Sequence, residues 1–173
     1  MGWRVAQTNR IMMQLSPDMR AGMLAGGASL ALLLGALTFQ YVGGLLPCLM
    51  CHWQRWPHIA AALIGLIGIV LIFAGLLPRS LARPMAIFAI AALALSGLIG
   101  IYHAGIEWDL WEGLSFCTPR DFNPADLSGP NAFRVVPCDV AAWRLFGISL
   151  AGYNALFSLG AAALSLMLLR VKR

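Results

Sequence analysis

The chain has 173 residues, of which 60% are hydrophobic and only 11% are charged, and its formal net charge is +5. Soluble proteins carry about 25% charged residues, so this composition excludes a soluble globular protein and indicates a polytopic membrane protein. The arginines stand singly or in small groups beside apolar runs, which marks them as topology signals and argues against a nucleic-acid partner.

Four apolar runs predict four transmembrane helices. Residues 21–42 are uncharged, which is long enough to cross about 30 Å of hydrocarbon. Further helices are expected at about 57–77, with Pro57 in the first turn, at 85–103 and at 145–169. We therefore expect an all-α membrane protein, a four-helix bundle in which residues 1–173 form a single integral membrane domain.

The basic residues predict the orientation of this bundle. The N-terminal segment, the 78–84 hairpin and the C-terminus together hold eight Lys or Arg and one acid, whereas the other side holds four Arg and six acids. The positive-inside rule places both termini in the cytoplasm. The loops at 43–56 and 104–144, with all four cysteines, then lie on the outer side, a compartment that permits disulfides if the membrane is a bacterial inner membrane.

The second outer loop is long and has two parts. Residues 104–114 carry apolar residues four positions apart, with tryptophans and acids between them, and predict a short amphipathic helix lying in the interface. A proline-rich irregular segment follows, bracketed by Cys117 and Cys138.

Cys48 and Cys51 form a C-x-x-C pair at the junction of the first two apolar runs, and Arg55 follows. If this turn is helical, Cys51 and Arg55 share one face. The guanidinium and the free N–H groups of a helix start then both favour a thiolate at Cys51. The pattern predicts a reactive pair; the alternative is two buried residues acting as small hydrophobes.

A bond between Cys117 and Cys138 would close a loop of about 20 residues and contribute roughly 3 kcal/mol in the chain-entropy model. A purely structural bridge is one interpretation. However, a bridge across irregular backbone restrains little and leaves both sulfurs accessible. Together with the first dithiol, this favours a relay by thiolate attack, mixed disulfide and resolution.

Disulfide formation releases two electrons and two protons, and a quinone is the obvious lipid-soluble acceptor. Arg55 is suited to stabilise both the Cys51 thiolate and a developing quinone oxyanion. His103, at the outer end of the third helix, is placed to hydrogen-bond a quinone carbonyl or carry its proton, or else it faces water. His58 is an intramembrane polar residue of open role, and Asn154 is expected to bond between helices.

Several of these residues occur in an order and spacing typical of one family. They are Phe39-Gln40, Pro47-Cys48, Cys51, Arg55, Tyr102-His103, Cys138 and Trp143. Over nearly its whole length the chain resembles the DsbB family of disulfide bond formation proteins, quinone-coupled thiol oxidases of the bacterial inner membrane. Glu107 stands where many members have Gln, which leaves its role open.

This resemblance implies that the chain reoxidises a thioredoxin-like periplasmic oxidase of the DsbA type. The partner's cysteine would attack Cys117, and the released Cys138 thiolate would be oxidised at Cys48. Cys51 would then pass the electrons to ubiquinone or menaquinone, with Arg55 and His103 near the quinone.

Three other classes use similar residues. Cys48-Leu49-Met50-Cys51-His52 matches the C-x-x-C-H haem attachment motif of c-type cytochromes, although the loop is short for a haem pocket. Vitamin K epoxide reductase-like quinone reductases also combine four helices with four thiols, but their loop cysteines precede the C-x-x-C. A membrane anchor with a structural zinc on all four thiolates would need both pairs to surround one ion. We expect no metal at this site.

Overall fold

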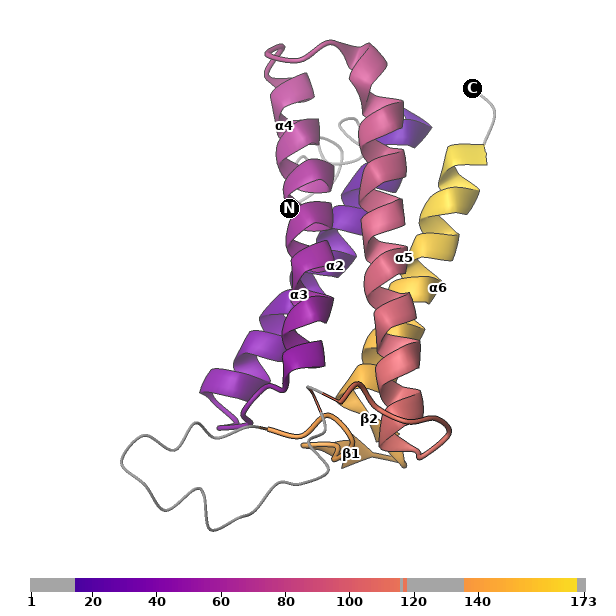
Figure 1. Ribbon diagram of the computed structural model, residues 1–173. Helices are drawn as coiled ribbons and strands as arrows, with labels where there is room; N and C mark the ends of the chain where they lie inside the picture. Colours follow the sequence, from indigo (N-terminus) through magenta and orange to yellow (C-terminus); the bar gives the residue numbers. More distant parts are fainter. Residues whose placement is uncertain (1–14, 116, 118–135, 171–173) are drawn as a thin grey trace.

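The computed structural model describes residues 15–115, 117 and 136–170, and within them four helical runs lie side by side (Figure 1). All four are long and apolar enough to cross a membrane, which confirms the predicted all-α bundle. The first run is α2 (Pro17–Tyr41), and the second comprises α3 (Leu49–Ala62), the π-helical turn η1 (Leu63–Ile67) and α4 (Gly68–Phe73). The third is the 3-10 turn η2 (Arg79–Leu81) with α5 (Ala82–Glu107), and the fourth is α6 (Leu150–Arg170).

The helices approach closely because small residues line their contacts. A Cβ placed on Gly26 of α2 would lie only 3.0 Å from the carbonyl carbon of Gly65 in η1. A Cβ on Gly100 of α5 would lie 2.9 Å from the carbonyl oxygen of Ala151 in α6. Since lipid supplies no hydrophobic drive between helices, such close backbone packing is a main source of their association.

The second helix begins eight residues earlier than expected, so Pro57 lies inside α3 and not in its first turn. Cys48 causes the early start, because it is the N-cap and its Sγ accepts a hydrogen bond from the N–H of Cys51 at 3.2 Å. The C-x-x-C motif therefore forms the first turn of a membrane-crossing helix.

The fourth helix begins at Leu150, five residues later than expected. The residues before it form a hairpin of β1 (Arg144–Leu145) and β2 (Ile148–Ser149), which pair antiparallel. Phe146 and Gly147 make the two-residue turn, both with positive φ, as tight hairpin turns require.

The expected amphipathic helix at 104–114 is not a separate element. Its first turn is the end of α5, and the chain then turns at Asp109, where φ is +56°. Trp111 folds back, stacks on Tyr102 and donates its indole N–H to the Tyr102 carbonyl at 2.9 Å. The apolar spacing does not mark an interfacial helix here, because Ile106 is buried in the cluster that holds the cysteines.

The arrangement separates two ends of the bundle. In Figure 1 the α4–α5 connection, with Arg79 and Arg83, lies at the same end of the bundle as the C-terminus of α6 at Arg170. The start of α3 and the β1–β2 hairpin lie at the opposite end. The Cys48–Cys51 motif is therefore at the end of the bundle away from the basic α4–α5 connection.

Candidate functional site

Cys48 and Cys51 face each other at the start of α3, with the Cys48 thiol donating to Cys51 Sγ at 2.8 Å. Cys48 is buried and Cys51 half-buried. The hydrogen bond with Cys51, together with burial, raises the pKa of Cys48. Loss of the proton from Cys48 is therefore disfavoured in the reduced pair.

Cys117 and Cys138 form a disulfide, with their Cα atoms 5.6 Å apart. The N–H of Cys138 also donates to the Cys117 carbonyl at 3.1 Å. The expectation that both sulfurs are accessible is wrong, because the two residues are only 2% and 0% exposed. They are covered because they pack into an apolar cluster with Met50 and Ile106.

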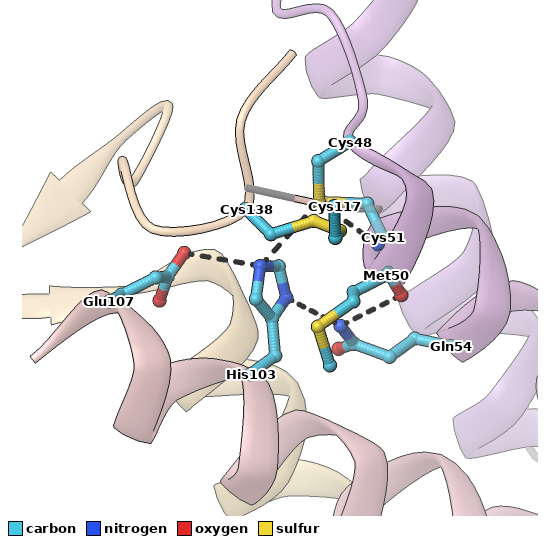
Figure 2. The surroundings of a disulfide bond; sticks show 8 residues. All are labelled: Cys48, Met50, Cys51, Gln54, His103, Glu107, Cys117 and Cys138. Atoms are coloured by element: carbon cyan, nitrogen blue, oxygen red, sulfur yellow. Dashed lines mark hydrogen bonds and ion pairs between the residues drawn. A yellow bond between two sulfur atoms is a disulfide. The ribbon is translucent and has the colours of Figure 1, made fainter. Parts of the chain in front are cut away.

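The two cysteine pairs meet in that cluster (Figure 2). Cys48 belongs to it with Cys117 and Cys138, and Cys51 packs against its edge. Four sulfurs from three parts of the chain thus lie together at one end of the bundle.

His103 lies against this sulfur cluster. Its ring is 2% exposed, which excludes the interpretation that it faces water. Nε2 lies 3.5 Å from Cys48 Sγ and 3.8 Å from Glu107 Oε1, while Nδ1 lies 2.9 Å from Gln54 Nε2. In Figure 2 Glu107 and Gln54 approach the ring from opposite sides.

A hydrogen-bond network that sequence reasoning missed extends from His103 into the bundle. Gln54 Oε1 accepts from Asn154 Nδ2 at 2.7 Å, and Asn154 Oδ1 lies 2.8 Å from His58 Nε2. Ser96 Oγ lies 2.9 Å from the same His58 nitrogen. The expected interhelical bonding of Asn154 is confirmed. Ser96 stands alone in an apolar run, which was the available signal, whereas Gln54 lies among the polar residues of the segment after Cys51 and carries no such signal.

A cavity of about 370 Å³ opens beside Cys51, between α2, α3 and α6. Its walls are mostly apolar and aromatic. The rings of Phe39, Trp143 and Tyr153 contact one another in series at tilted angles, with ring centroids 5.1 and 6.1 Å apart. The polar lining residues are Gln40, Cys51, Gln54, Arg55, His58 and Asn154. His103 does not belong to this lining, and it contacts Cys48 instead.

Two polar atoms of the cavity lining lack a partner among the described residues. They are Arg55 Nε and His58 Nδ1, both buried. Arg55 is otherwise held by Gln40, whose Oε1 accepts from Arg55 Nη1 at 2.6 Å. Buried polar groups are normally satisfied, so these two fit a ligand that brings oxygen atoms into an apolar, aromatic pocket.

Glu107 connects α5 to the hairpin. It is 8% exposed, its carboxylate accepts from Ser149 Oγ, and its backbone carbonyl accepts from Arg144 Nη2 at 2.7 Å. These bonds give Glu107 a structural role, because they hold the end of α5 against the start of α6.

The geometry also bears on the rival interpretations. The ligand atoms of Cys48, Cys51 and His103 lie within 4.8 Å of one another, a spacing that a metal ion tolerates. A zinc site on four thiolates does not form, because Cys117 and Cys138 are bonded to each other.

The four apolar helices bring a dithiol and a disulfide into one buried cluster. This arrangement is typical of a membrane-embedded thiol–disulfide oxidoreductase. The family model described as disulfide bond formation protein DsbB matches residues 19–168. The chain therefore belongs to the DsbB family of disulfide oxidoreductases, and the cytochrome and vitamin K epoxide reductase-like interpretations are not supported.

Relatives of known name agree with this assignment. Disulfide bond formation protein B of Methylococcus capsulatus is 31% identical over 140 residues, covering 79% of this chain and 85% of the relative. The protein of the same name from Haemophilus influenzae is 27% identical over 175 residues, covering 92% and 90% of the two chains. That from Actinobacillus pleuropneumoniae is 29% identical over 145 residues, covering 79% and 77%. No solved structure matches the chain.

Proposed function

We propose that this protein reoxidises a periplasmic dithiol oxidase of the DsbA type and passes the electrons through two cysteine pairs to a membrane quinone, ubiquinone or menaquinone. One observation carries the proposal: Cys48 packs against the Cys117–Cys138 disulfide, while Cys51 lines the apolar cavity. The Cys117–Cys138 pair would thus exchange with the protein substrate, and Cys51 would reach the lipid-soluble acceptor.

The exchange begins at the outer pair. A thiolate of the partner attacks Cys117, a mixed disulfide forms, and Cys138 leaves as a thiolate. Cys138 then attacks Cys48 in an oxidised Cys48–Cys51 pair, so that the Cys48–Cys138 bond forms and Cys51 leaves with the electron pair. Burial of Cys117 means that docking of the partner must first expose its sulfur.

The second half of the cycle restores the outer bond. The partner's second thiolate releases Cys117, which attacks Cys138 and displaces Cys48 as a thiolate. The products are an oxidised partner, a Cys117–Cys138 disulfide and a reduced Cys48–Cys51 pair, which is the combination of sulfur states in this structure.

Arg55 and the aromatic walls are the residues that would hold the quinone. When bound, this group supplies an acceptor for the two electrons and two protons of the Cys48–Cys51 dithiol. Arg55, one helical turn after Cys51, favours the thiolate on Cys51 and has a free Nε for an oxygen of the ligand. Phe39, Trp143 and Tyr153 offer faces to a planar ring.

We also propose that residues 1–173 form a single integral domain of the bacterial inner membrane, with both termini cytoplasmic. Arg79, Arg83 and Arg170 lie at the end of the bundle opposite the cysteines, as the positive-inside rule requires if the cysteines are periplasmic. Labelling of intact cells with a membrane-impermeant thiol reagent tests this orientation when single cysteines are introduced at the exposed Val140 and Leu76 of a cysteine-free variant. Label at position 140 and not at position 76 is expected, and the reverse would contradict the orientation.

The direct test of activity is anaerobic mixing of purified protein, a reduced DsbA-type oxidase and ubiquinone-1 or a short-chain menaquinone, following quinone absorbance. We expect one quinone reduced per partner disulfide formed. A quinone that stays oxidised while the partner is consumed would contradict the proposal.

A further inference from the structure

The two carboxamides beside the sulfur cluster have orientations that backbone carbonyls dictate. Gln54 Nε2 lies 3.2 Å from the Met50 carbonyl oxygen, which can only accept. Asn154 Nδ2 lies 3.2 Å from the Ser96 carbonyl oxygen and donates to Gln54 Oε1 at 2.7 Å. Reversing either amide would set oxygen against oxygen, so the Gln54 nitrogen must be the atom that faces His103.

This orientation determines where His103 carries its hydrogen. The Gln54 amide nitrogen has only donors to offer, and it lies 2.9 Å from His103 Nδ1. Nδ1 must therefore accept, and a neutral imidazole with Nδ1 as acceptor carries its hydrogen on Nε2. The Nε2 atom lies 3.5 Å from Cys48 Sγ, so in this tautomer His103 presents a donor, and not a lone pair, to the sulfur.

We propose that Gln54 is a positioning residue, which fixes the Nε2–H tautomer of His103 so that this N–H stabilises Cys48 when it leaves as a thiolate. The inference rests on the proposed function, in which the Cys117 thiolate attacks Cys138 of the Cys48–Cys138 bond. The Cys117–Cys138 bond forms, the Cys48–Cys138 bond breaks, and the electron pair goes to Cys48. No proton moves in this step. The hydrogen bond from His103 Nε2–H to Cys48 Sγ becomes stronger because the sulfur gains a negative charge.

Two further observations support a donor at this place. A thiol of high pKa is a slow leaving group, and the surroundings of Cys48 raise its pKa. The Cys138 backbone carbonyl also accepts a hydrogen bond from the His103 ring, and Glu107 Oε1 lies farther from Nε2 than the sulfur does, at 3.8 Å. The same tautomer disfavours a metal on Cys48, Cys51 and His103, because the nitrogen that faces the sulfurs carries a hydrogen.

The tautomer can be read directly by ¹⁵N NMR of histidine-labelled full-length protein in detergent, with His103→Gln identifying the His103 signals. We expect the Nε2–H form in the unmodified protein. Gln54→Glu replaces the donor by an acceptor of the same shape and should put a hydrogen on Nδ1. An Nδ1–H form in the unmodified protein, or a tautomer indifferent to Gln54→Glu, would overturn the proposal.

The consequence for sulfur is measured by alkylation of Cys48 as a function of pH. In a Cys51→Ala background, with the other two cysteines bonded, Cys48 is the one free thiol. Gln54→Leu should lower the alkylation rate of Cys48 at neutral pH by up to about tenfold and move the midpoint of its pH profile to higher pH. Without the Gln54 donor, Nδ1 can carry the hydrogen, and the hydrogen bond from Nε2–H to the Cys48 thiolate is then lost. Ser165→Ala, a buried serine bonded within α6, is the control and should leave the midpoint unchanged.

A double-mutant cycle separates positioning from general loosening of the structure. Because Gln54 acts on Cys48 through His103, adding Gln54→Leu to His103→Leu should shift the midpoint no further than His103→Leu alone. Additive shifts would refute the mechanism. These measurements use no quinone, so they can succeed or fail independently of the quinone assay.

Discussion

Two adjacent glycines of α2 allow the packing of the bundle to be tested with a built-in control. A methyl group on Gly26 would lie 3.0 Å from both the carbonyl carbon of Gly65 and the nitrogen of Leu66. Ordinary carbon contacts are about 3.5–4.0 Å, so α2 and η1 would have to move apart. A methyl group on Gly27 would meet nothing within 4 Å.

Both alanine substitutions bring the same helix-propensity gain, up to about 1 kcal/mol, so that gain cancels between the two variants. Overpacking costs typically about 1–3 kcal/mol. We therefore expect Gly26→Ala to be about 1–3 kcal/mol less stable than Gly27→Ala. Reversible unfolding in mixed detergent micelles measures the difference. Equal stabilities for the two variants would refute the close crossing of α2 and η1.

The remaining predictions concern the site. Asn154→Leu leaves Gln54 Oε1 without its donor and should cost about 1–3 kcal/mol of unfolding free energy, measured in the same micelles; a loss no larger than that of a conservative surface change would contradict the network. Arg55→Ala should raise the apparent KM for quinone several-fold more than that for the partner, and equal effects would remove Arg55 from the cavity function. Cys51→Ser should abolish quinone reduction, whereas full turnover by this variant would show that Cys51 does not pass the electrons to the quinone. Cys117→Ser should prevent formation of a mixed disulfide with the partner. Detection of that mixed disulfide on gels would show that the partner attacks a cysteine other than Cys117.

The number of helices was predictable because apolar runs of this length have few other uses. The residues at which the helices begin were harder to predict from the sequence. The start of α3 depends on Cys48 acting as an N-cap through its sulfur, a role that Ser, Thr, Asp or Asn usually takes. The start of α6 depends on positive φ at Phe146 and Gly147, which the apolar pattern does not encode.

The site was only partly predictable for a related reason. Cys51 and Arg55 are one turn apart, so local spacing was enough to place both on the cavity wall. The contacts of His103 come from Gln54, 49 residues away in sequence, and those of Gln54 from Asn154, 100 residues away. Pairings of this kind depend on how the helices are rotated against one another, which hydrophobic periodicity in a uniformly apolar helix does not specify.

The most direct test of the sulfur relay is a double variant, Cys51→Ser with Cys117→Ser, which leaves Cys48 and Cys138 as the only cysteines. Because these two pack in one cluster, mild oxidation of the folded protein should join them quantitatively, and mass spectrometry of the digested chain should find the linked peptides. Recovery of both as free thiols, in protein whose helices remain assembled, would contradict the proposed transfer from the outer pair to the inner one.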